Sequence, residues 1–129
     1  MVPVTAFYAA LAALFLVYLG SRVTFCRRRH KVGLGDGGNH ELSVLIRAHA
    51  NAVENIPITL LLMLFAELNG LATVHLHTIG ILLIATRLLH ALGFIRSGGA
   101  YDIARFYGTL GGWLLIVALA IINVVLNYL

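Results

Sequence analysis

The chain has 129 residues, of which 60% are hydrophobic and only 11% are charged, and its formal net charge is +4. A soluble domain of this size does not combine so few charges with a mean hydropathy of +0.94, so these values exclude that class, and the length leaves no room for a second domain. The basic residues lie beside apolar segments, which indicates membrane topology and contact with anionic lipids and gives no case for nucleic-acid binding.

Apolar segments dominate the chain and are long enough to span a bilayer, whose hydrocarbon core of about 30 Å needs roughly 20 helical residues. Within a single domain, we predict helices over residues 2–27, 40–68, 72–95 and 102–128. The second and third segments contain ionisable side chains, but both remain apolar enough to cross. The sequence therefore predicts an all-α integral membrane protein, a bundle of four transmembrane helices.

The basic residues also predict the orientation of the chain. Those near the end of the first segment are Arg22, Arg27, Arg28, Arg29 and Lys31. Arg96 lies between the third and fourth segments, whereas the loop between the second and third has neither Lys nor Arg. By the positive-inside rule, both termini face outward, into the periplasm of a bacterium. The first segment lacks a basic n-region and a small-residue cleavage site, so we expect it to be retained and not removed as a signal peptide.

A polar face runs along the first half of the second segment. Arg47, Asn51 and Glu54 are spaced i, i+4 and i+7, so a cation, an amide and a carboxylate share one side of a helix. Ionisable side chains at membrane depth are costly unless they pair or line a wet cavity. This face is therefore a candidate functional site.

The third and fourth segments place further polar groups at the same membrane level. Arg87 and His90 lie near the end of the third segment, and Arg105 opens the fourth. Taken singly, Arg87 can snorkel to the interface and His90 can be a satisfied interior histidine. Polar groups from three helices at one level are not explained well by scattered interfacial residues, and they favour a shared site.

Other patterns in the chain do not indicate chemistry. The glycines within residues 33–38 match G-x-G-x-x-G, but no strand precedes them, so we interpret them as a loop. Cys26 is the only cysteine and cannot form an intrachain disulfide, and no histidine spacing is typical of zinc, so we expect no metal site. Gly108 and Gly112 form a small-x-x-x-small pair, which predicts close helix packing.

Taken in order, the polar motifs resemble those of the MAPEG family, the membrane-associated proteins in eicosanoid and glutathione metabolism. The residues that carry the resemblance are Arg47-Ala48-His49-x-Asn51-x-x-Glu54 with Pro57, then Arg87-x-x-His90, then Arg105. The Gly-Asp-Gly-Gly run at 35–38 resembles the small bacterial branch, and the similarity covers nearly the whole chain. It implies a homotrimer of four-helix subunits in the bacterial inner membrane, with glutathione sites between neighbouring subunits that open toward the cytoplasm.

The resemblance also implies roles for individual residues. The implied glutathione-binding positions are Arg47, Asn51, Glu54, Arg87, His90 and, from the run of Arg27 to Arg29, Arg28. Arg105 corresponds to the catalytic arginine that stabilises the thiolate. Arginine binds carboxylates through a charge-assisted fork, and a nearby cation lowers the pKa of a thiol. The implied function is a membrane-bound glutathione transferase or peroxidase that acts on hydrophobic electrophiles or lipid hydroperoxides.

Some family pocket positions are changed in this chain. Asn55 and Phe94 stand where well-studied members have tyrosines, and Phe106 stands where prostaglandin-forming members have a serine. These changes favour an alternative, a non-catalytic member that binds a lipid or small hydrophobic ligand or scaffolds another membrane protein.

A small transporter or proton relay is a third interpretation. It would be built on Glu54, Arg87 and His90, because intramembrane acids and histidines also serve proton transfer. It ranks last because the segments show neither an inverted repeat nor paired broken helices.

Overall fold

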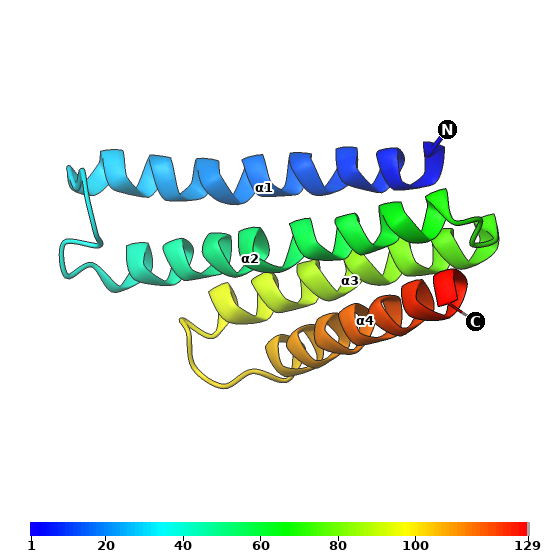
Figure 1. Cartoon of the computed structure of the whole chain (residues 1–129). Helices are drawn as coiled ribbons and strands as arrows, with labels where there is room; N and C mark the ends of the chain where they lie inside the picture. Colours follow the sequence, from blue (N-terminus) through cyan, green and yellow to red (C-terminus); the bar gives the residue numbers. More distant parts are fainter. Residues whose placement is uncertain (129) are drawn as a thin grey trace.

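The computed structural model describes residues 1–128, and within this range the chain forms four helices that run alongside one another (Figure 1). Their bounds are α1 (Pro3–His30), α2 (His40–Leu68), α3 (Thr73–Arg96) and α4 (Ile103–Tyr128). All are long and apolar enough to cross a membrane, and the two termini lie at the same end of the bundle. The predicted all-α architecture with four spans is confirmed.

The helices pack with α2 and α3 at the centre. Each of these two contacts every other helix, whereas α1 and α4 make no contact with one another within residues 1–128. At the end that holds the loop of residues 31–39, α1 and α2 extend beyond α3 and α4 (Figure 1). The structure therefore has a narrow two-helix end and a wider four-helix body.

The end of α1 lies three residues beyond the bound expected from the sequence. The last turn contains only basic residues, 27–30, whose charges interact favourably with the carbonyl end of the helix dipole. Lys31 then adopts a left-handed conformation, with φ of 54°, and the Val32 N–H donates to the Arg27 carbonyl at 3.0 Å. This turn stops the helix and reverses the chain toward α2.

The loop between α1 and α2 is built from local hydrogen bonds. The Asp36 carboxylate accepts from the Gly38 N–H at 2.9 Å, and this bond, with a second from Ser43, holds the pKa of Asp36 below its ordinary value. Asn39 caps α2, because its side-chain oxygen accepts from the Leu42 N–H at 2.8 Å. These contacts fix where α2 begins relative to the end of α1.

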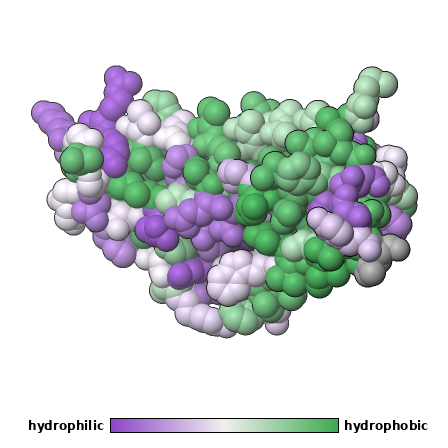
Figure 2. All heavy atoms as spheres, in the orientation of Figure 1, coloured by the Kyte–Doolittle hydropathy of each residue, from purple (hydrophilic) through white to green (hydrophobic). Residues whose placement is uncertain are grey.

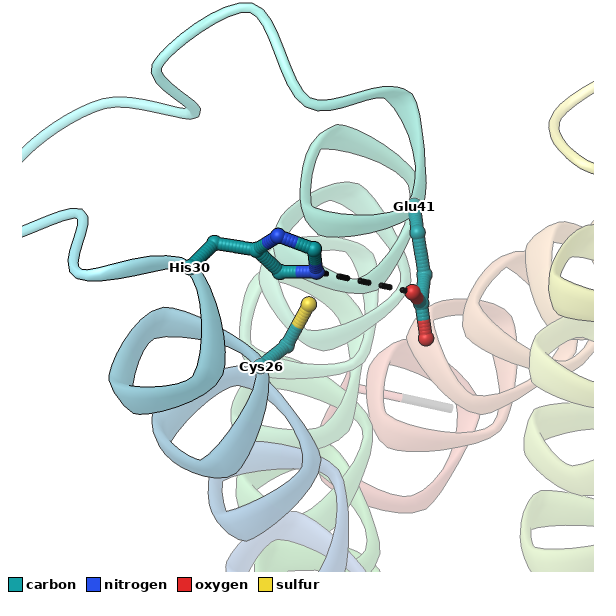
Figure 3. A group of neighbouring side chains, drawn as sticks. All are labelled: Cys26, His30 and Glu41. Atoms are coloured by element: carbon teal, nitrogen blue, oxygen red, sulfur yellow. Dashed lines mark ion pairs between the residues drawn. The ribbon is translucent and has the colours of Figure 1, made fainter.

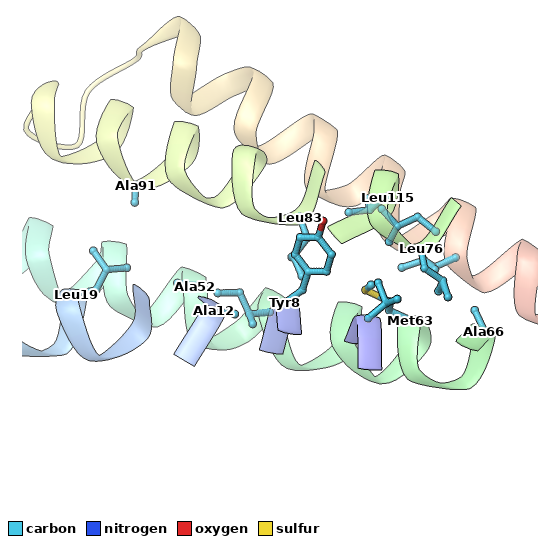
Figure 4. Close-up of a cluster of buried hydrophobic side chains, with 14 residues drawn as sticks. Tyr8, Ala12, Leu19, Ala52, Met63, Ala66, Leu76, Leu83, Ala91 and Leu115 are labelled. Atoms are coloured by element: carbon cyan, nitrogen blue, oxygen red, sulfur yellow. The ribbon is translucent and has the colours of Figure 1, made fainter. Parts of the chain in front are cut away.

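The apolar core extends along the bundle between the helices (Figure 4). Leu83 and Leu119 are almost fully buried in it, together with Met63 of α2 and Tyr8 of α1. Large apolar side chains also cover the outer surface of every helix, as expected for lipid contact. On the face shown in Figure 2, hydrophilic atoms gather toward the end with the α1–α2 loop, apart from a smaller group at the opposite end.

A carboxylate from α2 caps the start of α1. The N-cap residue, Val2, has no side-chain acceptor, but the Glu67 carboxylate accepts from the Val4 and Thr5 N–H groups at 3.0 and 2.7 Å. An anion at a helix N-terminus is stabilised both by these donors and by the dipole. Glu67, which lies within the apolar second segment, thus joins the termini of two helices.

We predict that Glu67→Ala lowers the free energy of unfolding by about 1–2 kcal/mol, because both acceptors of the α1 cap are lost. The measurement is thermal unfolding of the detergent-solubilised protein followed by circular dichroism. Glu67→Gln keeps one carbonyl acceptor and should lose less. An Ala variant that unfolds at the wild-type temperature would contradict this role of Glu67.

Candidate functional site

The polar face predicted on α2 exists, and its two charged members pair with each other. Arg47 Nη1 lies 3.8 Å from Glu54 Oε1, and the two side chains are 59% and 58% exposed. At a rise of 1.5 Å per residue, they lie roughly 10 and roughly 20 Å along α2 from its first residue. An exposed ion pair on the side of a membrane helix is costly in lipid, so this surface needs a polar neighbour.

Asn51 joins the same face to the interior of the bundle. Its Oδ1 accepts a hydrogen bond from Arg87 Nη1 at 3.3 Å, which links α2 to α3. Asn51 is only partly buried, so it lies between the exposed pair and the buried arginine. Asn51 of α2 and Arg87 of α3 are therefore in contact within one subunit.

Arg87 does not snorkel to the surface but lies inside the subunit, where only 3% of its area is exposed. Its Nη2 donates to the Gly108 carbonyl of α4 at 2.6 Å. The guanidinium fills space that Gly112 leaves free, since a Cβ at that position would overlap it. Arg87 thus joins α2, α3 and α4, and its predicted contact with a ligand stays a prediction.

His90 is also buried, and one of its two ring nitrogens has a hydrogen-bond partner. Its Nδ1 lies 2.9 Å from the Thr109 hydroxyl oxygen, which also lies 2.9 Å from the Arg105 carbonyl oxygen. Within residues 1–128, the buried Nε2 atom has no hydrogen-bond partner. The ring stacks on Phe94 with 5.9 Å between centroids. His90 is therefore an interior histidine of which one ring nitrogen has a hydrogen-bond partner and the other has none among the described residues.

Arg105 is held firmly by the loop between α3 and α4. Its Nη1 donates to the Gly99 and Ala100 carbonyls at 2.7 and 3.1 Å, and its guanidinium lies 4.4 Å from the centroid of the Phe94 ring. Its backbone N–H donates to Asp102 at 3.1 Å. Cation–π stacking and carbonyl contacts together fix the position of this charge.

The acid that anchors this loop is itself anchored by a salt bridge. Asp102 Oδ2 lies 2.6 Å from Arg96 Nη2, so Asp102 joins the end of α3 to the start of α4. The hydrogen bond from Arg96, followed by that from the Arg105 N–H, holds the pKa of the Asp102 carboxyl below its ordinary value. Asp102 therefore remains an anion at neutral pH and orients the first turn of α4.

A hollow of about 450 Å³ lies beside Arg105. Its lining residues come from α4 and the loop before it, namely Tyr101, Asp102, Arg105, Phe106, Thr109, Leu110 and Trp113. Trp113 was not identified as a candidate from the sequence, although its spacing from Arg105 and Thr109, i, i+4 and i+8, was a signal for one shared face. The hollow combines one cation, Arg105, and one anion, Asp102, with mostly apolar walls, and neither Arg47 nor Glu54 lines it.

Of the arginines at the end of α1, Arg28 has the freest side chain. Arg27 donates to the Gly35 carbonyl at 2.7 Å, and Arg29 lies 3.7 Å from Glu41. Arg28 is exposed and makes no side-chain hydrogen bond or salt bridge within the described part of the chain. It is therefore the member of the run that remains available to bind an anion.

These features define a polytopic helical membrane protein with buried and surface polar groups near one end of its bundle. The model of the MAPEG family matches residues 5–125, and the chain belongs to this family. It is similar to the proteins named inner membrane protein YecN of two Escherichia coli strains, each 50% identical over 91 residues, which is 70% of this chain and 70% of the relative. The resemblance found in the polar motifs is thus confirmed at the level of the family.

The predicted packing role of the α4 glycines is confirmed by the close approach of α3. A Cβ at Gly108 would lie 2.5 Å from the His90 backbone nitrogen and 2.8 Å from the Thr86 carbonyl oxygen. We predict that Gly108→Ala lowers the free energy of unfolding by about 1–3 kcal/mol, because backbone atoms cannot yield without separating the helices. The measurement is thermal unfolding in detergent.

The matched control for this substitution is Gly111→Ala. A Cβ there would lie 2.8 Å from the methyl group of Thr86, which is a side-chain atom, whereas the contacts of Gly108 are with backbone atoms. The Gly111 variant should lose less stability than the Gly108 variant, and equal losses would argue against a backbone contact as the cause.

Proposed function

We propose that this protein is a glutathione-dependent transferase or peroxidase of the inner membrane that acts on hydrophobic electrophiles or lipid hydroperoxides. The observation that supports it best is Arg105, a cation held in place at the edge of an apolar hollow. In a transferase reaction, the glutathione thiolate donates an electron pair to an electrophilic carbon, a C–S bond forms, and the leaving group departs with the bonding electrons. The role of Arg105 is to favour the thiolate.

The arrangement of Arg105 suits this role. Its Nη1 carries the bonds to the loop carbonyls, so the fixed part of the guanidinium faces the loop, and the hollow adjoins the same side chain. A cation within about 4–6 Å of a thiol typically lowers its pKa by about 1–3 units. Because the thiolate is the nucleophile, this shift raises the reactive fraction at neutral pH.

The α2 face supplies complementary charges for the rest of glutathione. The tripeptide carries two carboxylates and one ammonium group, which match Arg47 and Glu54 respectively. In the structure these two residues neutralise each other at 3.8 Å, and a ligand with both charges can replace that weak pair by two charge-assisted hydrogen bonds. Arg28 offers a cation for the second carboxylate, and Asn51 offers its amide.

A homotrimer accounts for the separation of these groups. The exposed Arg47–Glu54 pair does not line the hollow at Arg105, so one subunit alone does not bring all residues of the proposed site together. A second subunit laid against α2 would shield the ion pair from lipid and bring its own Arg105 to it. We place both termini in the periplasm and the site toward the cytoplasm, on the side of the arginine-rich loop.

We predict that glutathione added to the purified protein gives the ultraviolet difference absorbance of a thiolate, and that Arg105→Ala removes it at neutral pH. The pH of half-ionisation of the bound thiol should rise by about 1–3 units in the variant, because the nearby cation is lost. Arg105→Lys keeps the charge and should retain part of the signal.

Calorimetry separates binding from thiolate formation in this test. Arg105→Ala should still bind glutathione, whereas Arg47→Ala and Glu54→Gln should weaken binding. If the thiolate signal and the heat of binding were unchanged in every variant, the site assignment would be wrong. If the wild-type protein gave neither signal, glutathione chemistry would be excluded.

We further predict that mixed oligomers of the Arg47→Ala and Arg105→Ala variants form more glutathione thiolate than either variant alone. In a trimer that contains both Arg47→Ala and Arg105→Ala subunits, some boundaries join the intact α2 face of one subunit to the intact Arg105 of the next. Co-expression with two affinity tags, followed by sequential purification, yields these mixed oligomers for thiolate measurement. A site formed within one subunit would give no recovery, and a stable monomer in detergent would remove the intersubunit site.

The apolar walls of the hollow favour a second candidate function, the binding of a lipid or small hydrophobic ligand without catalysis. Phe106 and Trp113 line the hollow, and Phe94 lies under the guanidinium, where family members place pocket tyrosines. A protein that binds such a ligand and gives no thiolate signal with glutathione would have this function.

A further inference from the structure

Three metal-ligating side chains converge at the two-helix end of the bundle, away from the Arg105 hollow. They are Cys26 and His30 of α1 and Glu41 of α2, and their ligand atoms all lie within 4.8 Å of one another (Figure 3). We propose that Cys26, His30 and Glu41 form a binding site for Zn²⁺. This departs from the expectation, based on histidine spacing alone, that the chain has no metal site.

Local structure explains why these three residues meet. Cys26 and His30 are spaced i, i+4 and share one face of the last turns of α1. The left-handed Lys31 and the Asn39 cap then return the chain so that Glu41, in the first turn of α2, lies opposite that face. The cluster therefore rests on two helix ends and the ordered loop that joins them.

The donor set suits zinc better than magnesium or calcium. Thiolate and imidazole are ligands that Zn²⁺ prefers, whereas Mg²⁺ and Ca²⁺ take oxygen ligands. The thiolate and the carboxylate together neutralise the two charges of the ion, which matters beside so many arginines. Three protein ligands leave the fourth tetrahedral position for water.

The geometry needs only small movements to accept the ion. Zinc–ligand bonds of about 2.0–2.3 Å in a tetrahedral site place neighbouring ligand atoms about 3.5 Å apart. Cys26 is 3% exposed and packs against Leu42 and Leu45, so the sulfur is fixed, whereas the side chains of His30 and Glu41 are 35% and 54% exposed and have room to adjust. The apolar shell around the sulfur limits access of solvent to it.

The competing interpretation, a reactive cysteine activated by a histidine–carboxylate relay, does not fit the same atoms. In a relay, one imidazole nitrogen faces the thiol and the other faces the acid. Here His30 Nε2 lies 4.0 Å from the Glu41 carboxylate and is also the nitrogen beside the sulfur (Figure 3). Donors that converge on one point suit a shared cation.

Binding of the ion would tie the end of α1 to the start of α2. Glu41 is held near this point by Arg29 at 3.7 Å, and the metal replaces that exposed pair with a direct bond. The loop of residues 31–39 would then be fixed at both ends, next to Arg28. The role of the ion is to join the two helix ends, and it does not depend on the function proposed for Arg105.

The test is titration of the full-length, detergent-solubilised protein with Co²⁺ after chelator treatment, in the presence of a phosphine reductant. The proposal predicts one equivalent per chain, tetrahedral d–d bands and a thiolate-to-cobalt charge-transfer band, all displaced by one equivalent of Zn²⁺. Cys26→Ser should abolish the charge-transfer band. His30→Gln and Glu41→Gln should each weaken Co²⁺ binding more than tenfold, whereas His75→Gln, an exposed histidine of α3, should leave it unchanged.

A second measurement keeps the proposal testable if a variant folds poorly. Equimolar Zn²⁺ should slow alkylation of Cys26 in the wild-type protein and in the His75 variant, but not in His30→Gln. No charge-transfer band at one equivalent of Co²⁺ would overturn the proposal. So would binding that persists undiminished in both His30→Gln and Glu41→Gln.

Discussion

The buried guanidinium of Arg87 is the constraint on which the polar half of this bundle depends. A cation inside a membrane helix is tolerated only if the protein supplies its partners, and here a carbonyl of α4 and an amide of α2 do so. Its size also requires Gly112, because any side chain there would occupy the same space. The contact thus sets how closely α2, α3 and α4 approach one another.

The polar groups near this contact differ in how many hydrogen-bond partners they have inside the subunit. Arg87 makes two hydrogen bonds inside the subunit and His90 uses one nitrogen, whereas the Arg47–Glu54 pair lies on the outer surface. Arg87 therefore stabilises the packing of three helices, whereas the Arg47–Glu54 pair lies within α2 alone.

The opposite ends of the bundle are closed by different means. At the end with the termini, the Glu67 carboxylate replaces a missing cap at the start of α1. At the other end, the left-handed turn at Lys31 and the Asn39 cap bring α1 and α2 together with charged and ligating groups on their facing surfaces. Both solutions use the few polar side chains of the chain to satisfy exposed backbone groups.

The sequence by itself determined the spans, the family and the shared face of Arg47 and Glu54, because hydropathy and helical spacing are local properties. It did not determine that Arg87 lies in the interior, because an arginine at this position could equally reach the membrane interface by snorkelling. It also did not determine that Glu67 caps a helix 62 residues away in sequence. Nor did it reveal the cluster of Cys26 with Glu41. Such contacts depend on how helices turn and pack against one another, which only the tertiary structure decides.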